Sequence, residues 1–282
     1  MIPFRPFRPL LALALLAVAA VAHADQPRAR TAGPGVQVLP TPLAMPGLDR
    51  ARTLRVYVPP GYATSHKRYR VLYMHDGQNL FDDATSYAGE WGVDEAMDAL
   101  AKSDGIELIV VGVDNGNDAR IHELAPWPNP KFGAPEGVQY MAFVVHTVKP
   151  WIDAHFRTRP GRRDTGIMGS SLGGLTSHYA LFKYPDVFSK GGVISPSFWF
   201  SDQAYATVAP GKLRKGTRIW MSIGEKEGEE SVPDVLRMER ALRTLPSRTL
   251  DLHVHVVPGA EHNERAWRAE FPDAIRFLYG RR

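Results

Sequence analysis

The chain has 282 residues, of which 44% are hydrophobic and 23% are charged, and its formal net charge is +4. This composition is typical of a globular protein, and the length suits one large α/β domain. Long runs of Lys or Arg are absent, which argues against nucleic acid as a partner. Cysteine is absent too, and this excludes disulfides, thiolate metal sites and a cysteine nucleophile.

Residues 1–24 predict a signal peptide. Arg5 and Arg8 precede an apolar run from Leu10 to Val21, and Ala22-His23-Ala24 has the form of a signal-peptidase site. The run is short for a membrane span, which needs about 20 residues. We therefore expect a periplasmic or secreted protein that leaves the membrane after cleavage, with an uncleaved anchor as the alternative.

Residues 25–50 are rich in Pro, Gly and Ala and predict an N-terminal arm, with a short strand near residues 36–39. In residues 51–282, apolar β-rich runs alternate with helical patterns, as in one α/β domain with a mostly parallel sheet and helices on both faces. The predicted strands are Thr53–Val58, Arg70–Met74, Leu108–Val113, Thr165–Met168, Gly192–Ile194, Arg218–Ile223 and Leu250–Val257. The predicted helices are Val93–Lys102, Val138–Phe156, Leu172–Tyr184, Val232–Leu245 and Glu264–Leu278. Residues 76–89, 114–137 and 195–215 are long loops, which are often binding loops.

The segment Gly169-Ser170-Ser171-Leu172-Gly173 fits the G-x-S-x-G pattern, with Ser171 at its centre. A predicted strand precedes it and a predicted helix follows, which is the context of a nucleophile elbow. Ser170 is the rival nucleophile, but its spacing from the glycines is wrong by one. The N–H of Leu172 is expected to donate to an oxyanion.

A second oxyanion donor is expected after the strand that ends at Met74, because hydrolases of this architecture place one in the corresponding turn. The turn reads His75-Asp76-Gly77-Gln78-Asn79. We expect the N–H of Gln78 to donate, with the N–H of Gly77 as the alternative. His75 is expected to have a structural role behind this loop.

The order serine, acid, histidine is expected along the chain. His178 follows Ser171 by only seven residues on the same predicted helix, so it cannot fold back onto the serine. His253 and His255 share one face of a predicted strand. A solvent-exposed face is the favoured interpretation of this pair, and half of a metal site is the alternative. His262 lies in the loop before the last helix and is the expected base.

The acid should follow the strand that ends at Ile223, where the chain reads Gly224-Glu225-Lys226-Glu227. The spacing Gly-x-x-acid favours Glu227, and Glu225 is the alternative.

These segments resemble the putative esterase family of α/β-hydrolases, which includes siderophore, feruloyl and acetylxylan esterases, S-formylglutathione hydrolases and secreted mycolyltransferases. The bacterial hydrolases of the siderophore-esterase type look most similar. The resemblance covers about residues 38–280 and implies an α/β-hydrolase fold. The matching stretches are YMHDGQNLFD (73–82), MGSSLGGL (168–175), SPSFWF (195–200), IGEKEG (223–228) and GAEHN (259–263).

The stretch Arg120-Ile121-His122-Glu123-Leu124 looks like the R-x-x-E-L segment of this family. The resemblance implies that Arg120 lies near the substrate mouth. An ion pair that orders the loop, with an acid such as Glu123, is the alternative role for Arg120.

Together the residues favour a secreted serine carboxylic-ester hydrolase with a Ser171–His262–Glu227 triad, an acyl-enzyme intermediate, and neither cofactor nor metal. An acyltransferase that passes the acyl group to an alcohol or sugar would use the same triad. A peptidase and an inactive binding module are further alternatives.

The substrate is expected to be a small-molecule or polysaccharide-linked ester. Aromatic residues in or beside the long loops could bind a bulky group, or could instead pack in the core; they are Trp91, Trp127, Phe198 and Trp199. The sequence indicates no oligomeric state.

Overall fold

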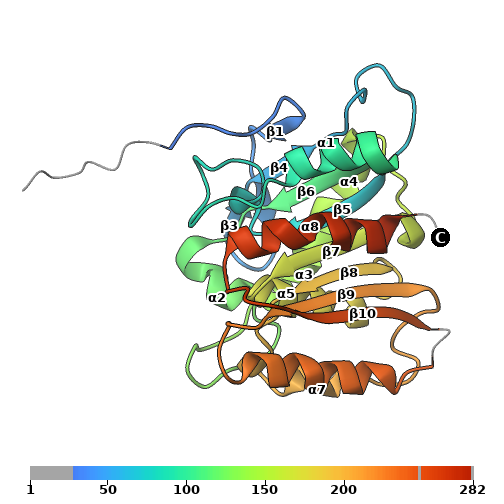
Figure 1. Ribbon diagram of the computed structural model, residues 1–282. Coiled ribbons are helices and arrows are strands. Elements are labelled where there is room, and N and C mark those ends of the chain that lie inside the picture. The colour runs from blue at the N-terminus through green and yellow to red at the C-terminus, as the bar shows by residue number, and fades with distance from the viewer. Residues whose placement is uncertain (1–27, 247–248, 281–282) are drawn as a thin grey trace, which may run out of the picture.

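The computed structural model describes residues 28–246 and 249–280, so the expected signal peptide lies outside the described part. Eight strands form one sheet in the order β1-β4-β6-β5-β7-β8-β9-β10 (Figure 1). Their bounds are β1 Val36–Val38, β4 Leu54–Tyr57, β5 Arg70–His75, β6 Leu108–Val113, β7 Thr165–Ser170, β8 Lys190–Ile194, β9 Thr217–Gly224 and β10 Leu250–Val257.

The sheet is antiparallel at one edge and parallel elsewhere. Strand β1 pairs antiparallel with β4, and β4 pairs antiparallel with β6, whereas every pairing from β6 to β10 is parallel. Strands β6 and β7 are buried at every position, as expected of parallel strands that are covered on both faces.

Helices cover both faces of the sheet, and each face has its own apolar core (Figure 1). On one face, α1 (Val93–Asp104) and α8 (Glu264–Tyr279) pack side by side. The other face carries α5 (Leu172–Lys183), α7 (Ser231–Arg243) and the helical stretch formed by α3 (Gly137–Phe143) and α4 (Lys149–His155). The short helices α2 (Arg120–Glu123) and α6 (Gln203–Ala206) lie within two of the long loops.

Two local features differ from the sequence prediction. The strands β2 (Leu43–Met45) and β3 (Arg50–Arg52) form an unpredicted hairpin across the expected start of the domain. The predicted helix Val138–Phe156 is interrupted by a π-helical turn at Val144–Val148. An inserted residue of this kind cannot be read from apolar spacing, because the pattern on either side of it remains helical.

The carboxyl ends of the parallel strands meet at one edge of the sheet, where open α/β sheets bind their ligands. Gln78 follows β5, Ser171 follows β7, Glu227 follows β9 and His262 follows β10. This arrangement confirms the predicted fold class, a mostly parallel sheet with helices on both faces. Within the described ranges, no helix is long and apolar enough to span a bilayer.

Candidate active site

Ser171 lies on a sharp turn between β7 and α5. Its backbone angles are φ 60° and ψ −125°, a strained conformation for a residue with a side chain. A Cβ atom on Gly169 would lie 2.9 Å from the backbone of Gly173, and one on Gly174 would lie 2.6 Å from the carbonyl oxygen of Ile194. The turn can therefore form only with small residues at these positions, as the G-x-S-x-G pattern predicts.

Two backbone N–H groups are candidates for an oxyanion hole. Leu172 is the first residue of α5, so its N–H has no acceptor within the helix. Gln78 lies in the 3-10 turn Gly77–Asn79 and lines the same cavity as Ser171. Its side-chain Oε1 accepts a hydrogen bond from the N–H of Asn115 at 3.0 Å, which fixes the turn against the neighbouring loop.

Gly77, the alternative donor, is buried and does not line this cavity. A Cβ atom there would lie 2.6 Å from Oδ1 of Asp114 and 2.8 Å from the carbonyl carbon of Gly112. Packing against the end of β6 therefore requires a glycine at this position.

The carboxylate of Glu227 contacts the ring of His262. Its Oε2 lies 2.7 Å from Nδ1 of His262, and its Oε1 accepts hydrogen bonds from the N–H of Gly224 at 2.7 Å and from Oγ of Ser195 at 2.6 Å. The side chain of Glu227 is only 2% exposed. Glu225 instead accepts a hydrogen bond from the N–H of Gly259 at 2.8 Å.

Ser195 and Trp267 support this contact, and the sequence prediction missed both. The indole N–H of Trp267 donates to Oγ of Ser195 at 2.9 Å, and its ring meets the ring of His262 edge to face at 5.0 Å. Ser195 also has a positive φ of 41°, which is uncommon for serine. No local sequence pattern indicates this network, because its members come from three separate loops and helices.

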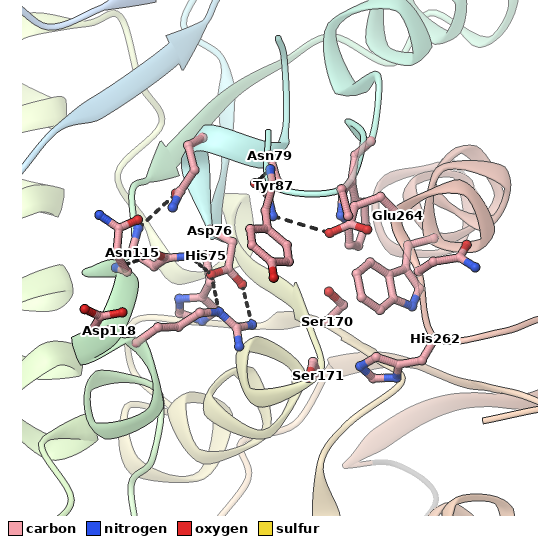
Figure 2. A pocket seen from close by; sticks show the side chains of 17 residues that line it. His75, Asp76, Asn79, Tyr87, Asn115, Asp118, Ser170, Ser171, His262 and Glu264 are labelled. Atoms are coloured by element: carbon pink, nitrogen blue, oxygen red, sulfur yellow. Dashed lines mark hydrogen bonds and ion pairs between the residues drawn. The ribbon is translucent and has the colours of Figure 1, made fainter. Parts of the chain in front are cut away.

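A cavity of about 510 Å³ opens beside Ser171 and His262 (Figure 2). Ser171 and His262 also line a second cavity of about 210 Å³, which Trp199 borders. Oγ of Ser171 lies 3.3 Å from Oγ of Ser197 in this smaller cavity. Ser170 lines the larger cavity as the last residue of β7, outside the turn.

Arg120 lines the larger cavity, but its ion-pair partner differs from the one considered above. Its Nε and Nη2 donate to the two oxygens of Asp76 at 2.6 and 2.8 Å. Glu123 instead pairs with Arg50 and Arg52. Burial alone would raise the pKa of Asp76, but the charge of Arg120 holds it below its ordinary value.

His75 lies behind the elbow, is buried, and borders the larger cavity. Its Nδ1 lies 2.8 Å from the hydroxyl of Tyr140, and burial lowers its pKa to about 4. A neutral imidazole at this position fills space next to Gly169 and Gly173, in line with the expected structural role.

The aromatic residues of the long loops divide into core and surface positions. Trp199 is 55% exposed, whereas Phe198 is 1% exposed, packs on His178 and Tyr205, and lines neither cavity. The expected substrate contact of Phe198 is therefore not supported, because its ring belongs to the core.

Trp91 lines the larger cavity with a ring that packs on Trp267 at 5.7 Å. Trp127 is buried against Tyr179. The sequence prediction missed Tyr87, which is 90% exposed and lines the larger cavity (Figure 2). Its polar loop carries no signal that distinguishes a binding residue from a solvated one.

Some side chains outside the Ser171 site are of the types that bind metal ions. The ring of His253 stacks on the ring of Trp220, and Nε2 of His255 lies 3.7 Å from Oε2 of Glu270. Within the described ranges, one group of three potential ligand side chains lies close enough together for a metal ion: Glu90, Asp94 and Glu95, at the start of α1. Arg268 lies 3.7 Å from Glu90 and offsets part of this negative charge.

Comparison with known proteins identifies the family. The sequence profile of the family described as "Putative esterase" matches residues 46–278, which is most of the chain. The chain belongs to this family. It is a serine-type carboxylic-ester hydrolase with the α/β-hydrolase fold, and the resemblance inferred from its motifs is confirmed.

Individual proteins are similar to this chain in sequence or in fold. The chain is 28% identical to the uncharacterized protein YbbA of Bacillus subtilis, over 82% of this chain and 93% of that protein. It is similar in structure to an IroE-like serine hydrolase of Shewanella oneidensis, with a TM-score of 0.72, 22% identity, and coverage of 86% and 80% of the two chains. It also resembles the enterobactin esterase FES of Shigella flexneri, with a TM-score of 0.69, 16% identity, and coverage of 88% and 60%.

Proposed function

We propose that Ser171, His262 and Glu227 form the catalytic triad of an exported carboxylic-ester hydrolase. The observation that carries this proposal is the 2.7 Å contact between Glu227 and His262, next to a serine on a strained elbow. A carboxylate bound to Nδ1 leaves Nε2 of the imidazole available to accept the proton of the serine.

In this proposal, Oγ of Ser171 attacks the ester carbonyl carbon while His262 takes the hydroxyl proton. The N–H groups of Leu172 and Gln78 bind the oxyanion of the tetrahedral intermediate. The C–O bond to the alcohol then breaks, and His262 returns the proton to the leaving alcohol. Water attacks the acyl-enzyme in the same way and releases the acid, so no cofactor is required.

The nucleophile can be tested by covalent labelling of the purified protein with a fluorophosphonate. We expect Ser171→Ala to abolish labelling and ester hydrolysis. Ser170→Ala, on the preceding residue, is the matched control and should keep both. Labelling that persists in Ser171→Ala would refute the assignment.

Export is part of the proposal and is supported by the sequence of residues 1–24 alone. If the peptidase cleaves after Ala24, the exported protein begins at Asp25. Intact-mass measurement of the protein from the periplasm or medium tests this. A membrane-bound form that still begins at Met1 would indicate an anchor instead.

A further inference from the structure

The two cavities that meet at Ser171 contain carboxylates but almost no positive charge. The charged side chains that line the larger cavity are Asp76, Asp118, Arg120 and Glu264, together with the ring of His262. Glu227 and His262 are the ionisable side chains of the smaller cavity. Arg120 is thus the sole Lys or Arg among the described residues that line either cavity.

The charge of Arg120 is offset by a neighbouring carboxylate. Its side chain forms a two-point ion pair with Asp76, at 2.6 and 2.8 Å, and Asp76 is itself 7% exposed. This pair is neutral as a unit. The remaining carboxylates of the larger cavity, next to which an ester would bind, are those of Asp118 and Glu264.

Asp118 and Glu264 come from different parts of the chain and lie on opposite sides of Ser171 in Figure 2. Asp118 is exposed in the 3-10 turn Asn117–Ala119 before α2, and Glu264 is the first residue of α8. In the part of the chain that the structure describes, neither forms an ion pair with a basic side chain. Burial raises the pKa of Glu264 above its ordinary value, so a higher pH favours its charged form.

Aromatic surface accompanies these carboxylates. Tyr87 is 90% exposed at the larger cavity, and Trp91 and Trp267 form part of its wall. Aromatic faces next to carboxylates attract organic cations, quaternary ammonium groups above all. The same surroundings disfavour a carboxylate or another anion, because like charges repel and the one cation of the cavity wall, Arg120, is already paired with Asp76.

We infer that this site selects esters by charge, accepting those with a cationic group most readily, neutral ones less so and anionic ones least. The inference rests on the proposed function, since it concerns the substrate of the Ser171 site. The chain as a whole carries a net charge of +4. A preference for cations would therefore arise from the cavity and not from the overall charge.

The test uses three para-nitrophenyl esters whose acyl chains have matched length. One ends in a trimethylammonium group (trimethylammoniobutanoyl), one in the neutral tert-butyl isostere (dimethylhexanoyl), and one in a carboxylate (glutaryl). Butyrylcholine and its neutral dimethylbutyl isostere place the charge on the alcohol side. The values of kcat/KM are compared at low ionic strength and at about pH 8, which lies above the ordinary pKa of a carboxyl group.

The effect should appear on the side of the ester, acyl or alcohol, that occupies the larger cavity. On that side we expect kcat/KM of the cationic ester to be about fivefold higher than that of its neutral isostere, and kcat/KM of the anionic ester to be lower by a similar factor. High salt should compress both ratios. Asp118→Asn with Glu264→Gln should move both ratios toward one. Glu107→Gln, at the amino end of β6 on the opposite edge of the sheet, is the matched control and should leave them unchanged.

Each ratio compares two substrates on one enzyme preparation, so partial misfolding of a variant does not change it. Hydrolysis of the glutaryl ester at or above the rate of its neutral isostere would overturn the inference. A charge ranking that the double variant leaves unchanged would overturn it too. In both cases the proposed function stands, because the esters are hydrolysed. Failure to hydrolyse any ester would overturn the proposed function and this inference together.

Discussion

Glu227 and Glu225 are separated by one residue, yet they bind opposite ends of the loop that carries His262. The carboxylate of Glu227 contacts Nδ1 of the imidazole. The carboxylate of Glu225 accepts a hydrogen bond from the N–H of Gly259, near the start of that loop. A neutral Glu227→Gln would keep the packing but lose the charge that stabilises the imidazolium. We expect kcat to fall by up to about 10⁴-fold.

Glu225→Gln is the matched control and should lose little activity, since its side chain can still accept the hydrogen bond of Gly259. The reverse pattern would transfer the acid role to Glu225. Nearly unchanged rates in both variants would indicate that Ser171 and His262 act as a dyad.

Ser195 holds the carboxylate of Glu227, the proposed triad acid. Its hydroxyl donates to Oε1 of Glu227 and accepts the indole N–H of Trp267. Ser195→Ala removes one hydrogen bond to the carboxylate and leaves a buried indole donor unpaired. We expect kcat to fall about tenfold with little change in KM, and the pH dependence of kcat to shift. Ser231→Ala is the control, because that hydroxyl binds the backbone carbonyl of Glu227 and not the carboxylate.

The pair of Arg120 and Asp76 is a buried ion pair at the edge of the site. Arg120→Met would leave Asp76 with its charge buried and its main partner removed. We expect the free energy of unfolding to fall by about 3 kcal/mol, as measured by urea denaturation. Asp76→Asn combined with Arg120→Met should recover part of this loss, since no unpaired charge remains. A single variant as stable as the wild type would show that the pair contributes little.

Asp94 makes stability depend on pH in a direction opposite to that of a salt-bridged acid. Burial raises its pKa from 3.8 to about 7 in the folded protein. Between these values the folded state holds a proton that the unfolded state has released, so the free energy of unfolding falls as the pH rises.

Asp94→Asn removes this titration, while its side-chain oxygen can still accept the N–H of Gly33. Urea unfolding at a series of pH values should therefore show that the free energy of unfolding of the variant rises relative to that of the wild type from about pH 4 to about pH 7. Parallel pH curves for the two proteins would contradict the raised pKa.

Chelation should leave ester hydrolysis intact, because the proposed chemistry uses serine, histidine and backbone N–H groups alone. The group of possible metal ligands at the start of α1 includes no member of the proposed triad; it consists of Glu90, Asp94 and Glu95. We expect equal kcat/KM with and without EDTA. Loss of activity that a divalent cation restores would mean that the hydrolytic mechanism involves a metal.

The sequence predicted the fold and the positions of Ser171, Glu227 and His262 because each follows a strand in a spacing that the fold dictates. It failed where neighbours are set by three-dimensional packing. Arg120 pairs with Asp76, an acid in a distant loop, and not with nearby Glu123. Of the adjacent aromatic residues Phe198 and Trp199, one is buried and the other exposed, and a turn of three residues has no periodicity that could distinguish them.

The elbow conformation of Ser171 has a consequence for how this chain can change over time. A positive φ at this residue is a standing cost of about 1–3 kcal/mol for any side chain other than glycine. Replacing the serine with glycine would relieve that cost and would also remove the proposed nucleophile. A single substitution at this position would thus exchange the proposed activity for stability.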